Sequence, residues 1–216
     1  MPKEQHTSIA CFITPHGFGH AARACAVMST LLERDPTTHF KIFTQVPEWF
    51  FTKSGITNIT YTPLKTDVGL VQDTPMRENL PATIELLNEQ LPYRLGVLDE
   101  LGQMISDCRF VICDVSTMGI AVAEVAGIPS VLIENFTWDW VYEQYASRTA
   151  AMRRHASYLR SIRQRANVLI QAEPLCHARK NKLTVNPIAR KLRQSREECR
   201  EALGIAADRK LILITT

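Results

Sequence analysis

The stretch IACFITPHGFGHAAR, residues 9–23, contains the features that decide the fold. Its first five residues form an apolar, β-prone run that stops at Thr14-Pro15, and Gly17 and Gly19 follow. A helical pattern then opens at His20. A buried strand, a glycine turn and a helix start in this order are typical of the ligand-facing corner of an open parallel α/β sheet. The sequence therefore predicts that the His20 imidazole lies at the carboxyl edge of the first strand.

The rest of the chain repeats this alternation of apolar strand patterns and helical patterns. Further strands are expected at 39–45, 58–61, 109–113, 129–133 and 167–171. Helices are expected at 20–33, at 47–55, at 81–107 with a break near Pro92, at 118–126, and at 134–165 after an aromatic start. Residues 62–80 mix prolines, glycine and charges and are expected to form a long loop, which is usually functional. The pattern predicts an α/β fold with a Rossmann-like, doubly wound parallel sheet.

The C-terminal part of the chain changes character after residue 173. Residues 174–194 lack periodicity and are expected to be a connector. Ser195 then begins a helix to Leu203, with Glu198 in the capping-box position. The chain closes with an apolar run, 210–216, that is expected to be a strand. The sequence therefore predicts one Rossmann-like domain over 1–173 and, at 195–216, the start of a truncated second domain.

Charge is distributed unevenly along the chain. The net charge is +3, but residues 148–200 hold fourteen Lys and Arg against three acids, leaving eleven basic and nineteen acidic residues elsewhere. A basic region of this kind suits an anionic membrane surface, a phosphate-bearing ligand or simply solvated helix faces. No aromatic-interleaved basic motif accompanies the charge, so nucleic acid is not expected as a partner. A weak peripheral membrane contact through 148–200 is one open interpretation.

Composition also bears on compartment and on metal binding. No run of eighteen apolar residues occurs and the first eight residues are polar, so a cytoplasmic location is expected. The six cysteines form no CxxC pair and are expected to be reduced thiols. His16 and His20 are four residues apart, but they straddle a glycine turn without a neighbouring ligand, so no metal site is expected.

The glycine loop formally satisfies the dinucleotide fingerprint, as Gly17-x-Gly19-x-x-Ala22. An NAD-type oxidoreductase is therefore one alternative function. That fingerprint also requires an acidic residue at the end of the second strand to hold the ribose hydroxyls, and this chain has Thr44-Gln45 there. The missing acid disfavours the dinucleotide interpretation.

His20 and Asp114 form the sharpest pair in the sequence. Both are expected at the carboxyl ends of central strands, so they can meet over the edge of the sheet. A carboxylate bonded to one imidazole nitrogen fixes the tautomer and supports the imidazolium that forms when the other nitrogen takes a proton. The alternative is structural, with His20 closing its loop and Asp114 capping the following helix.

The segment ENFTWDWVYEQY, 134–145, begins at the end of a strand and is rich in aromatic residues. Its aromatic side chains either line a sugar-stacking wall or pack in the core, and polar residues lie between them. The aromatic residues are Trp138, Trp140, Tyr142 and Tyr145, and the polar ones are Glu134, Asn135 and Asp139.

With these residues identified, the chain resembles the N-terminal domain of GT-B glycosyltransferases, and in particular the glycosyltransferase-like front part of arabinokinase-type proteins. The similar segments cover most of the chain. They are HGFGHAAR (16–23), VICDVSTMGIAVAEVAGIPSV (111–131), NFTWDWVYEQY (135–145), and NPIARKLRQSREECREALGI with KLILITT (186–216).

The resemblance implies an inverting glycosyltransferase in which this domain binds the acceptor, a small molecule or a glycolipid. A C-terminal domain would bind a nucleotide-sugar, expected to be a UDP-sugar, as co-substrate, and no permanently bound cofactor is implied. His20 matches the general base of the plant-type members and Asp114 matches the aspartate that orients it. The glycine-rich loop and the acidic donor motif of the family are absent, so this chain is expected to bind acceptor without completing transfer alone.

The remaining site residues follow from position and resemblance together. The residues expected to bind substrate are His16, Gly17, Phe18, Gly19, Arg23, Gly69, Gln72, Asn135, Trp138 and Asp139. The alternative to an enzyme is a non-catalytic sugar- or nucleotide-binding module that regulates an attached domain.

Overall fold

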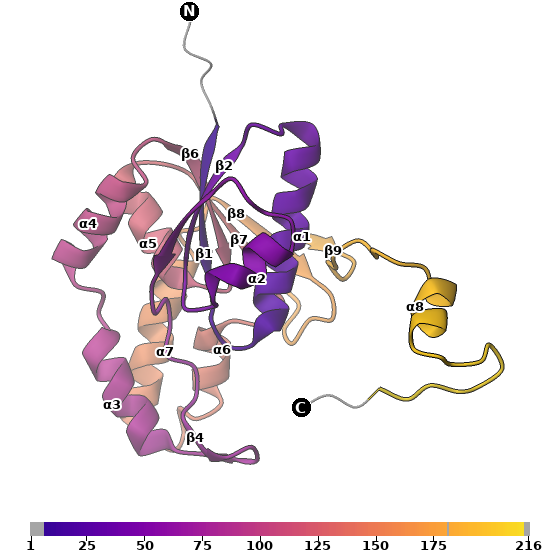
Figure 1. Cartoon of the computed structure of the whole chain (residues 1–216). Helices are drawn as coiled ribbons and strands as arrows, with labels where there is room; N and C mark the ends of the chain where they lie inside the picture. The colour runs from indigo at the N-terminus through magenta and orange to yellow at the C-terminus, as the bar shows by residue number, and fades with distance from the viewer. Residues whose placement is uncertain (1–6, 181, 214–216) are drawn as a thin grey trace, which may run out of the picture.

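The chain folds around one parallel sheet of seven strands in the order β3-β2-β1-β6-β7-β8-β9 (Figure 1). The computed structural model describes residues 7–180 and 182–213. The strands are β1 (Ser8–Ile13), β2 (His39–Thr44), β3 (Ile59–Pro63), β6 (Cys108–Asp114), β7 (Ser130–Glu134), β8 (Val168–Ala172) and β9 (Leu183–Val185), with a separate hairpin of β4 (Gln72–Thr74) and β5 (Arg77–Glu78). The helices are α1 (Phe18–Arg34), α2 (Glu48–Lys53), α3 (Leu80–Gln90), α4 (Leu95–Met104), α5 (Thr117–Ala126), α6 (Trp138–Glu143), α7 (Ala150–Arg163) and α8 (Arg196–Ala202). The predicted fold class is confirmed.

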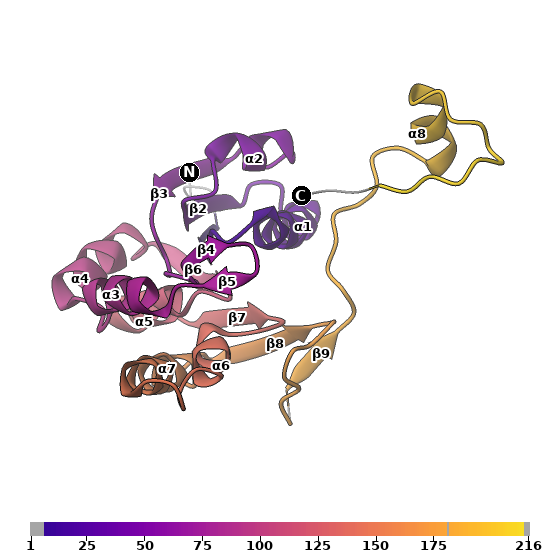
Figure 2. The ribbon, with the colours of Figure 1, turned by 90° about the horizontal axis from the view of Figure 1, so that it is seen from below.

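The central strand β1 is buried on both faces, and its alternate residues reach different helix layers. Ile9, Cys11 and Ile13 pack with α1 and α2, whereas Ala10 and Phe12 pack in the cluster that α3–α7 cover. Figure 2 shows α1 and α2 on one side of the sheet and α3–α5 on the other. The chain moves outward from β1 to β3 and then returns to β6, which pairs with the other edge of β1. This reversal creates a switch point at the carboxyl ends of β1 and β6, where open α/β sheets bind ligands.

Three segments differ from the sequence prediction: 62–80, 174–194 and 134–165. The expected loop 62–80 contains the β4–β5 hairpin, and the expected connector 174–194 contains β9, paired in parallel with β8. The strands of the hairpin and β9 are only two or three residues long, which is too short to show the alternation of apolar and polar residues that predicts a strand. The expected helical region 81–107 is divided into α3 and α4 by the extended residues 91–94, which confirms the predicted break near Pro92. Near the aromatic segment, α6 and α7 are likewise separate helices.

The C-terminal helix is confirmed and the terminal strand is not. α8 follows Ser195, whose hydroxyl accepts from the Glu198 amide while the Glu198 carboxylate accepts from the Ser195 amide. Figure 1 shows α8 standing apart from the sheet. The predicted strand 210–216 is not formed over 210–213, because no described strand lies beside it to share hydrogen bonds, and 214–216 fall outside the described residues. Leu211, Ile212 and Leu213 are exposed instead.

Many cations of the basic region are paired with acids on the same molecule. Those in ion pairs are Arg148, Arg160, Arg163, Arg165, Arg179 and Lys191. Much of the positive charge in 148–200 is therefore used in internal contacts. In the part of the chain that the structure describes, no helix has the length and apolar character needed to cross a bilayer.

Helix α5 lies so close to the sheet that one of its residues has no room for a side chain. A Cβ added at Gly119 would come within 2.7 Å of Cys113 Sγ and 2.7 Å of Phe12 Cβ. We expect Gly119→Ala to lower the free energy of unfolding by about 1–3 kcal/mol, because the helix or the strands must shift. In α4, Gly96→Ala is the matched control, since nothing lies within 4 Å of its added Cβ. Urea denaturation of both variants tests this, and equal midpoints would contradict it.

Candidate active site

The loop after β1 and the end of β6 meet at the switch point. Ile13 is paired with Asp114 in the β1–β6 register, and the Thr14 amide donates to the Asp114 carbonyl at 3.2 Å. The glycine turn then sends α1 back over this edge from Gly17, whose φ of 86° favours glycine. His20 consequently lies in the first turn of α1, directly over the end of β6.

His20 and Asp114 are in contact, as the sequence predicts, and Arg23 joins them. His20 Nδ1 lies 2.9 Å from Asp114 Oδ1. Arg23 grips the same carboxylate with two bonds, Nε to Oδ2 at 2.7 Å and Nη2 to Oδ1 at 2.7 Å. The remaining Arg23 nitrogen, Nη1, donates to Asn135 Oδ1 at 2.9 Å. Asp114 is 1% exposed, so its charge depends on these two partners rather than on water.

The hydrogen bonds determine which nitrogen of His20 is available. Nδ1 lies 2.9 Å from Asp114 Oδ1, an acceptor, and 3.2 Å from Arg23 Nη2, a donor. We assign the proton to Nδ1, which then donates to Asp114, because the shorter contact is the one to the ionised carboxylate. Nε2 is then unprotonated, and it has no protein partner among residues 7–180 and 182–213. Phe136 packs edge-on against the imidazole, with 5.5 Å between ring centroids. This arrangement can accept a proton at Nε2.

The turn that follows Asp114 is strained. Val115 has a φ of 63°, a left-handed conformation that is costly for a β-branched residue. Its amide donates to the Ile133 carbonyl at 3.0 Å, and its side chain is fully buried. Strain of this kind persists only where surrounding structure holds it, and it clusters at functional sites. Here the strained residue directly follows Asp114, the last residue of β6.

A second histidine–carboxylate pair lies beside the first, and sequence analysis missed its acid. His16 Nε2 is 2.8 Å from Asp67 Oδ1. Asp67 also accepts from the hydroxyls of Thr14 at 2.8 Å and Thr66 at 3.0 Å. Asp67 lies in the loop after β3. The only signal in the sequence is that Thr66 and Asp67 are polar residues in a largely apolar stretch, LKTDVGL at 64–70.

Gly69 positions this second histidine. A Cβ at Gly69 would meet His16 Cε1 at 2.2 Å, so the backbone itself lies against the imidazole. The Tyr142 hydroxyl donates to the Gly69 carbonyl at 2.9 Å. Burial, together with the Asp67 charge, raises the pKa of Tyr142 well above its ordinary value, which keeps the phenol protonated as a donor. Trp138 packs edge-on against His16 at 4.9 Å.

Both histidines line one hollow with a volume of about 320 Å³. Its other lining residues are Gly19, Arg23, Asn135, Ala172, Glu173, Pro174, Pro187 and Ile188. The hollow therefore gathers five of the predicted site residues, four from 16–23 and Asn135 from the segment after β7.

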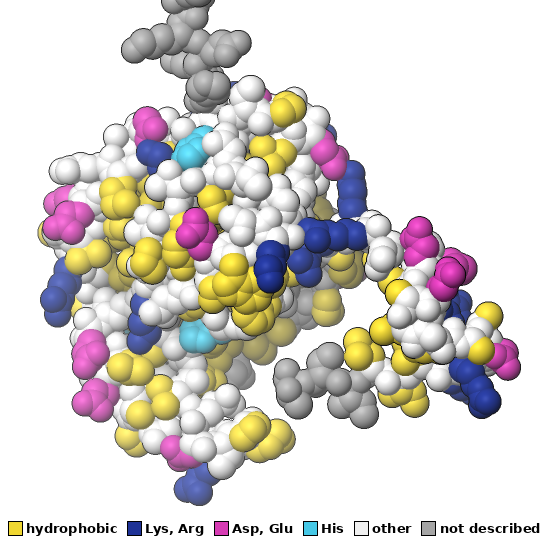
Figure 3. All heavy atoms as spheres, viewed as in Figure 1, with side chains coloured by type: hydrophobic (Ala, Val, Ile, Leu, Met, Phe, Trp, Pro, Cys, Tyr) yellow, Lys and Arg dark blue, Asp and Glu magenta, His cyan; other side chains and the backbone are white. Residues whose placement is uncertain are grey.

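Gly17 and Phe18 lie at the entrance to α1 rather than in the hollow. Phe18 is half exposed and stacks on Phe50, with 5.0 Å between centroids. The Arg190 guanidinium also lies over the Phe50 ring, 5.3 Å from its centroid. This contact holds the connector against α2. Figure 3 shows apolar and cationic side chains next to one another over α2.

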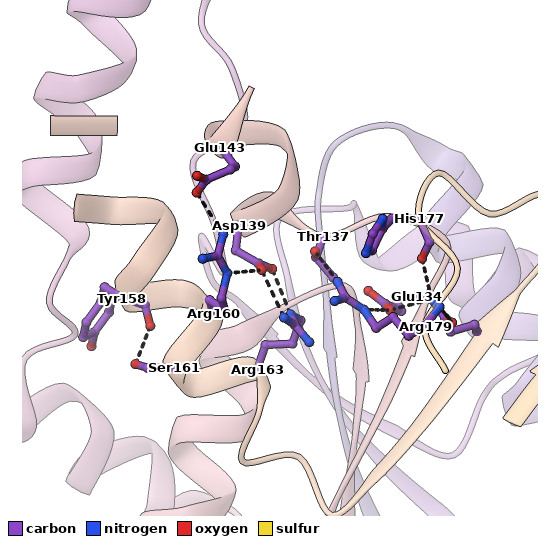
Figure 4. A network of polar contacts seen from close by, with 11 residues as sticks. Glu134, Thr137, Asp139, Glu143, Tyr158, Arg160, Ser161, Arg163, His177 and Arg179 are labelled. Carbon is purple, nitrogen blue, oxygen red and sulfur yellow. Dashed lines mark hydrogen bonds and ion pairs between the residues drawn. The ribbon is translucent and has the colours of Figure 1, made fainter. Parts of the chain in front are cut away.

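Gln72 and Asp139 are not brought to the hollow. Gln72 lies exposed on the β4–β5 hairpin, where its amide donates to the Pro75 carbonyl. Asp139 is buried in a bidentate ion pair with Arg163, at 3.0 and 3.2 Å, and Arg160 approaches it at 3.7 Å. Figure 4 shows this group tying α6 to α7. The geometry thus gives Asp139 a structural contact and places it outside the lining of the hollow.

Glu134 forms a related buried contact at the end of β7 (Figure 4). Its Oε1 accepts from Arg179 Nε and from Gln171 Nε2, each at 3.0 Å. Arg179 also donates to the Thr137 hydroxyl at 3.3 Å. These bonds fasten the segment after β8 next to the hollow.

The Asp139 contact predicts a stability effect without a ligand effect. We expect Asp139→Asn to lower the free energy of unfolding by about 2–4 kcal/mol, because the buried Arg163 loses its counter-charge. The matched control is Glu143→Gln, an exposed partner of Arg160, where about 0.5 kcal/mol or less is expected. Chemical denaturation measures both, and a stable Asp139→Asn protein that loses ligand binding would contradict this assignment.

The two histidines are expected to adopt opposite neutral tautomers. His20 should carry its proton on Nδ1 and His16 on Nε2, because these are the nitrogens that face Asp114 and Asp67. Long-range ¹H–¹⁵N spectra of ¹⁵N-histidine-labelled protein at alkaline pH distinguish the two forms. Asp114→Asn and Asp67→Asn should each weaken the preference of its own histidine alone. Identical tautomers in the unsubstituted protein would refute the hydrogen-bond assignment.

No protein-family model matches the chain. In sequence, it is similar to L-arabinokinase of Arabidopsis thaliana, with 29% identity over 219 residues that cover 97% of this chain and 21% of that protein. The chain thus spans about a fifth of the length of this curated relative.

Two solved structures share the architecture. The first is a UDP-glucosyltransferase from Polygonum tinctorium capable of glucosylating indoxyl, with a TM-score of 0.51, 17% identity, and coverage of 92% of this chain and 56% of that one. The second is the glycotransferase of kitacinnamycin, with a TM-score of 0.52, 13% identity, and coverage of 88% and 54%. At these identities the likeness concerns the fold. The chain has the fold of the N-terminal, Rossmann-like domain of GT-B glycosyltransferases, and it is similar in sequence to a part of L-arabinokinase.

Proposed function

We propose that the chain is the acceptor-binding part of an inverting, nucleotide-sugar-dependent glycosyltransferase. The observation that carries this proposal is the His20–Asp114 pair. A buried carboxylate holds one imidazole nitrogen at 2.9 Å, and the other nitrogen is left without a protein partner on a residue that lines the 320 Å³ hollow. The GT-B fold and the similarity to L-arabinokinase support it.

The proposed chemistry is one displacement. His20 Nε2 takes the proton of an acceptor hydroxyl as its oxygen attacks the anomeric carbon of the sugar. The new C–O bond forms while the bond from that carbon to the nucleoside diphosphate breaks, and the diphosphate leaves with the bonding electrons. Asp114 stabilises the imidazolium, which later returns its proton to solvent.

The division of labour between domains is part of the same proposal. Residues 1–173 would bind the acceptor, 174–194 would connect, and 195–216 would begin a second domain that binds the nucleotide-sugar. A UDP-sugar is the proposed donor, because one structure of the same fold is a UDP-glucosyltransferase. The amides around Gly17 and Gly19 would contact polar groups of the ligands at the start of α1.

The test is nucleoside-diphosphate release by the whole polypeptide that carries this chain, across a panel of nucleotide-sugars and acceptors. We expect release to require an acceptor and to fall at least about a hundredfold in His20→Ala, which removes the base. His39→Ala is the matched control, since His39 bonds Asn58 and Thr60 on the surface away from the hollow. Undiminished turnover in His20→Ala would contradict the proposed base.

A second candidate function is a non-catalytic sugar- or nucleotide-binding module. The bidentate Arg23–Asp114 pair favours it, because a guanidinium already neutralises the carboxylate that would support an imidazolium. Under this alternative, ligand binding persists in His20→Ala and no donor is turned over by the unsubstituted protein.

A further inference from the structure

We propose that His16 is a second hydroxyl-binding group of the hollow and that the acceptor is a polyhydroxylated ring, a sugar or a cyclitol, which offers one hydroxyl to His20 and another to His16. This inference rests on the proposed function and specifies its acceptor class. It is carried by the juxtaposition of two imidazoles, each held from behind by its own buried carboxylate, on one hollow.

The first step of the argument is that His16 is fixed in one tautomer. Asp67 is 7% exposed, and its two oxygens also accept from Thr14 and Thr66. The carboxylate is therefore oriented before His16 meets it. Asp67 Oδ1 lies 2.8 Å from Nε2, and a carboxylate so close to this nitrogen favours a proton on it, which leaves Nδ1 as the acceptor.

The second step is that the His16 ring has little freedom to turn away. The Gly69 backbone lies against one side of it, and Trp138 packs edge-on at 4.9 Å. Its side chain nevertheless keeps 33% of its surface exposed, unlike Asp67 behind it. A ring that is both restrained and accessible can bind a ligand at low entropic cost.

The third step concerns which ligand groups match the hollow. Two unprotonated ring nitrogens require two ligand donors, and Asn135 supplies an amide nitrogen whose partner oxygen is already bound by Arg23. Three of the five Arg23 N–H groups donate to Asp114 and Asn135, and the Asp114 carboxylate balances the guanidinium charge, so an anionic group meets little net positive charge there. Hydroxyls donate and accept, so neighbouring hydroxyls on one ring satisfy this set.

A flat aromatic acceptor matches the hollow less well. Trp138 is 9% exposed and stacks on Tyr142, with 5.7 Å between centroids, so its face is not offered to a ligand. A phenol also carries a single hydroxyl and leaves one imidazole without a donor. The geometry thus favours several hydroxyls over one aromatic plane.

The experiment uses ¹⁵N-histidine-labelled protein and two probes, myo-inositol and phenol, at about pH 8, where free imidazole is neutral. We expect myo-inositol to shift the His16 Nδ1 and His20 Nε2 resonances together along one saturation curve. Phenol is expected to shift His20 alone. Inositol that moves only His20, inositol that moves neither ring, or phenol that moves both rings equally would each overturn the inference.

Variants make the test specific to His16. We expect His16→Gln to weaken myo-inositol binding about five- to tenfold, the worth of one hydrogen bond, and to leave phenol binding unchanged. Gly69→Ala should also weaken myo-inositol binding, because the added methyl group displaces the His16 imidazole. Asp67→Asn keeps the His16 imidazole but removes the charge behind it, so it should weaken myo-inositol binding as well. His39→Gln is the control, with no change expected. Equal affinity for myo-inositol in all of these proteins would overturn the inference.

The outcome is separable from that of the proposed function. If nucleoside-diphosphate release depends on His20 but myo-inositol binding does not depend on His16, the transferase stands and the acceptor class is wrong. If inositol binds through both histidines and no donor is turned over, the acceptor class stands and the chain is a binding module.

Discussion

The buried charge of Asp114 is the interaction on which the rest of the site depends. A carboxylate that is 1% exposed is costly unless it is paired and fully hydrogen-bonded. Arg23 and His20 meet that requirement, and both come from the first two turns of α1. The ion pair therefore fixes the rotation and the approach of α1 over the sheet, while the Asp114 carbonyl holds the loop at Thr14. Backbone, helix and imidazole are organised around one side chain.

The two histidine–carboxylate pairs differ in how the carboxylate is compensated. Asp114 is bound by a guanidinium as well as by an imidazole, whereas Asp67 receives hydroxyl donors and an imidazole. The strong bidentate pair confers rigidity at the end of β6, and the strained Val115 turn adjoins it. The pair at His16 is instead stabilised by the loop after β3. Two independent segments thus converge on the same side of the switch point.

The sequence indicates those parts of the site that depend on strand order alone. His20 and Asp114 could be predicted to meet because each follows a central parallel strand, whose carboxyl ends share one edge. Asp67 could not, because its position depends on how an irregular loop folds across the end of β1. Asp139 is predicted near the ligand because it lies among aromatic residues just after a strand, and the structure pairs it with Arg163, twenty-four residues later. The spacing of residues near Asp139 does not indicate so distant a partner. Strand β9 could not be predicted because three residues are too few to show an alternating pattern.

The exposed apolar run after α8 has a consequence for solution behaviour. Leu211, Ile212 and Leu213 are between 55% and 82% exposed, in a β-prone stretch without charge. Uncharged, β-prone stretches of this kind are templates for intermolecular pairing when no neighbouring strand covers them. This 216-residue chain should consequently self-associate as its concentration rises. The intermolecular contacts would form through residues 211–213, and the sheet would remain folded.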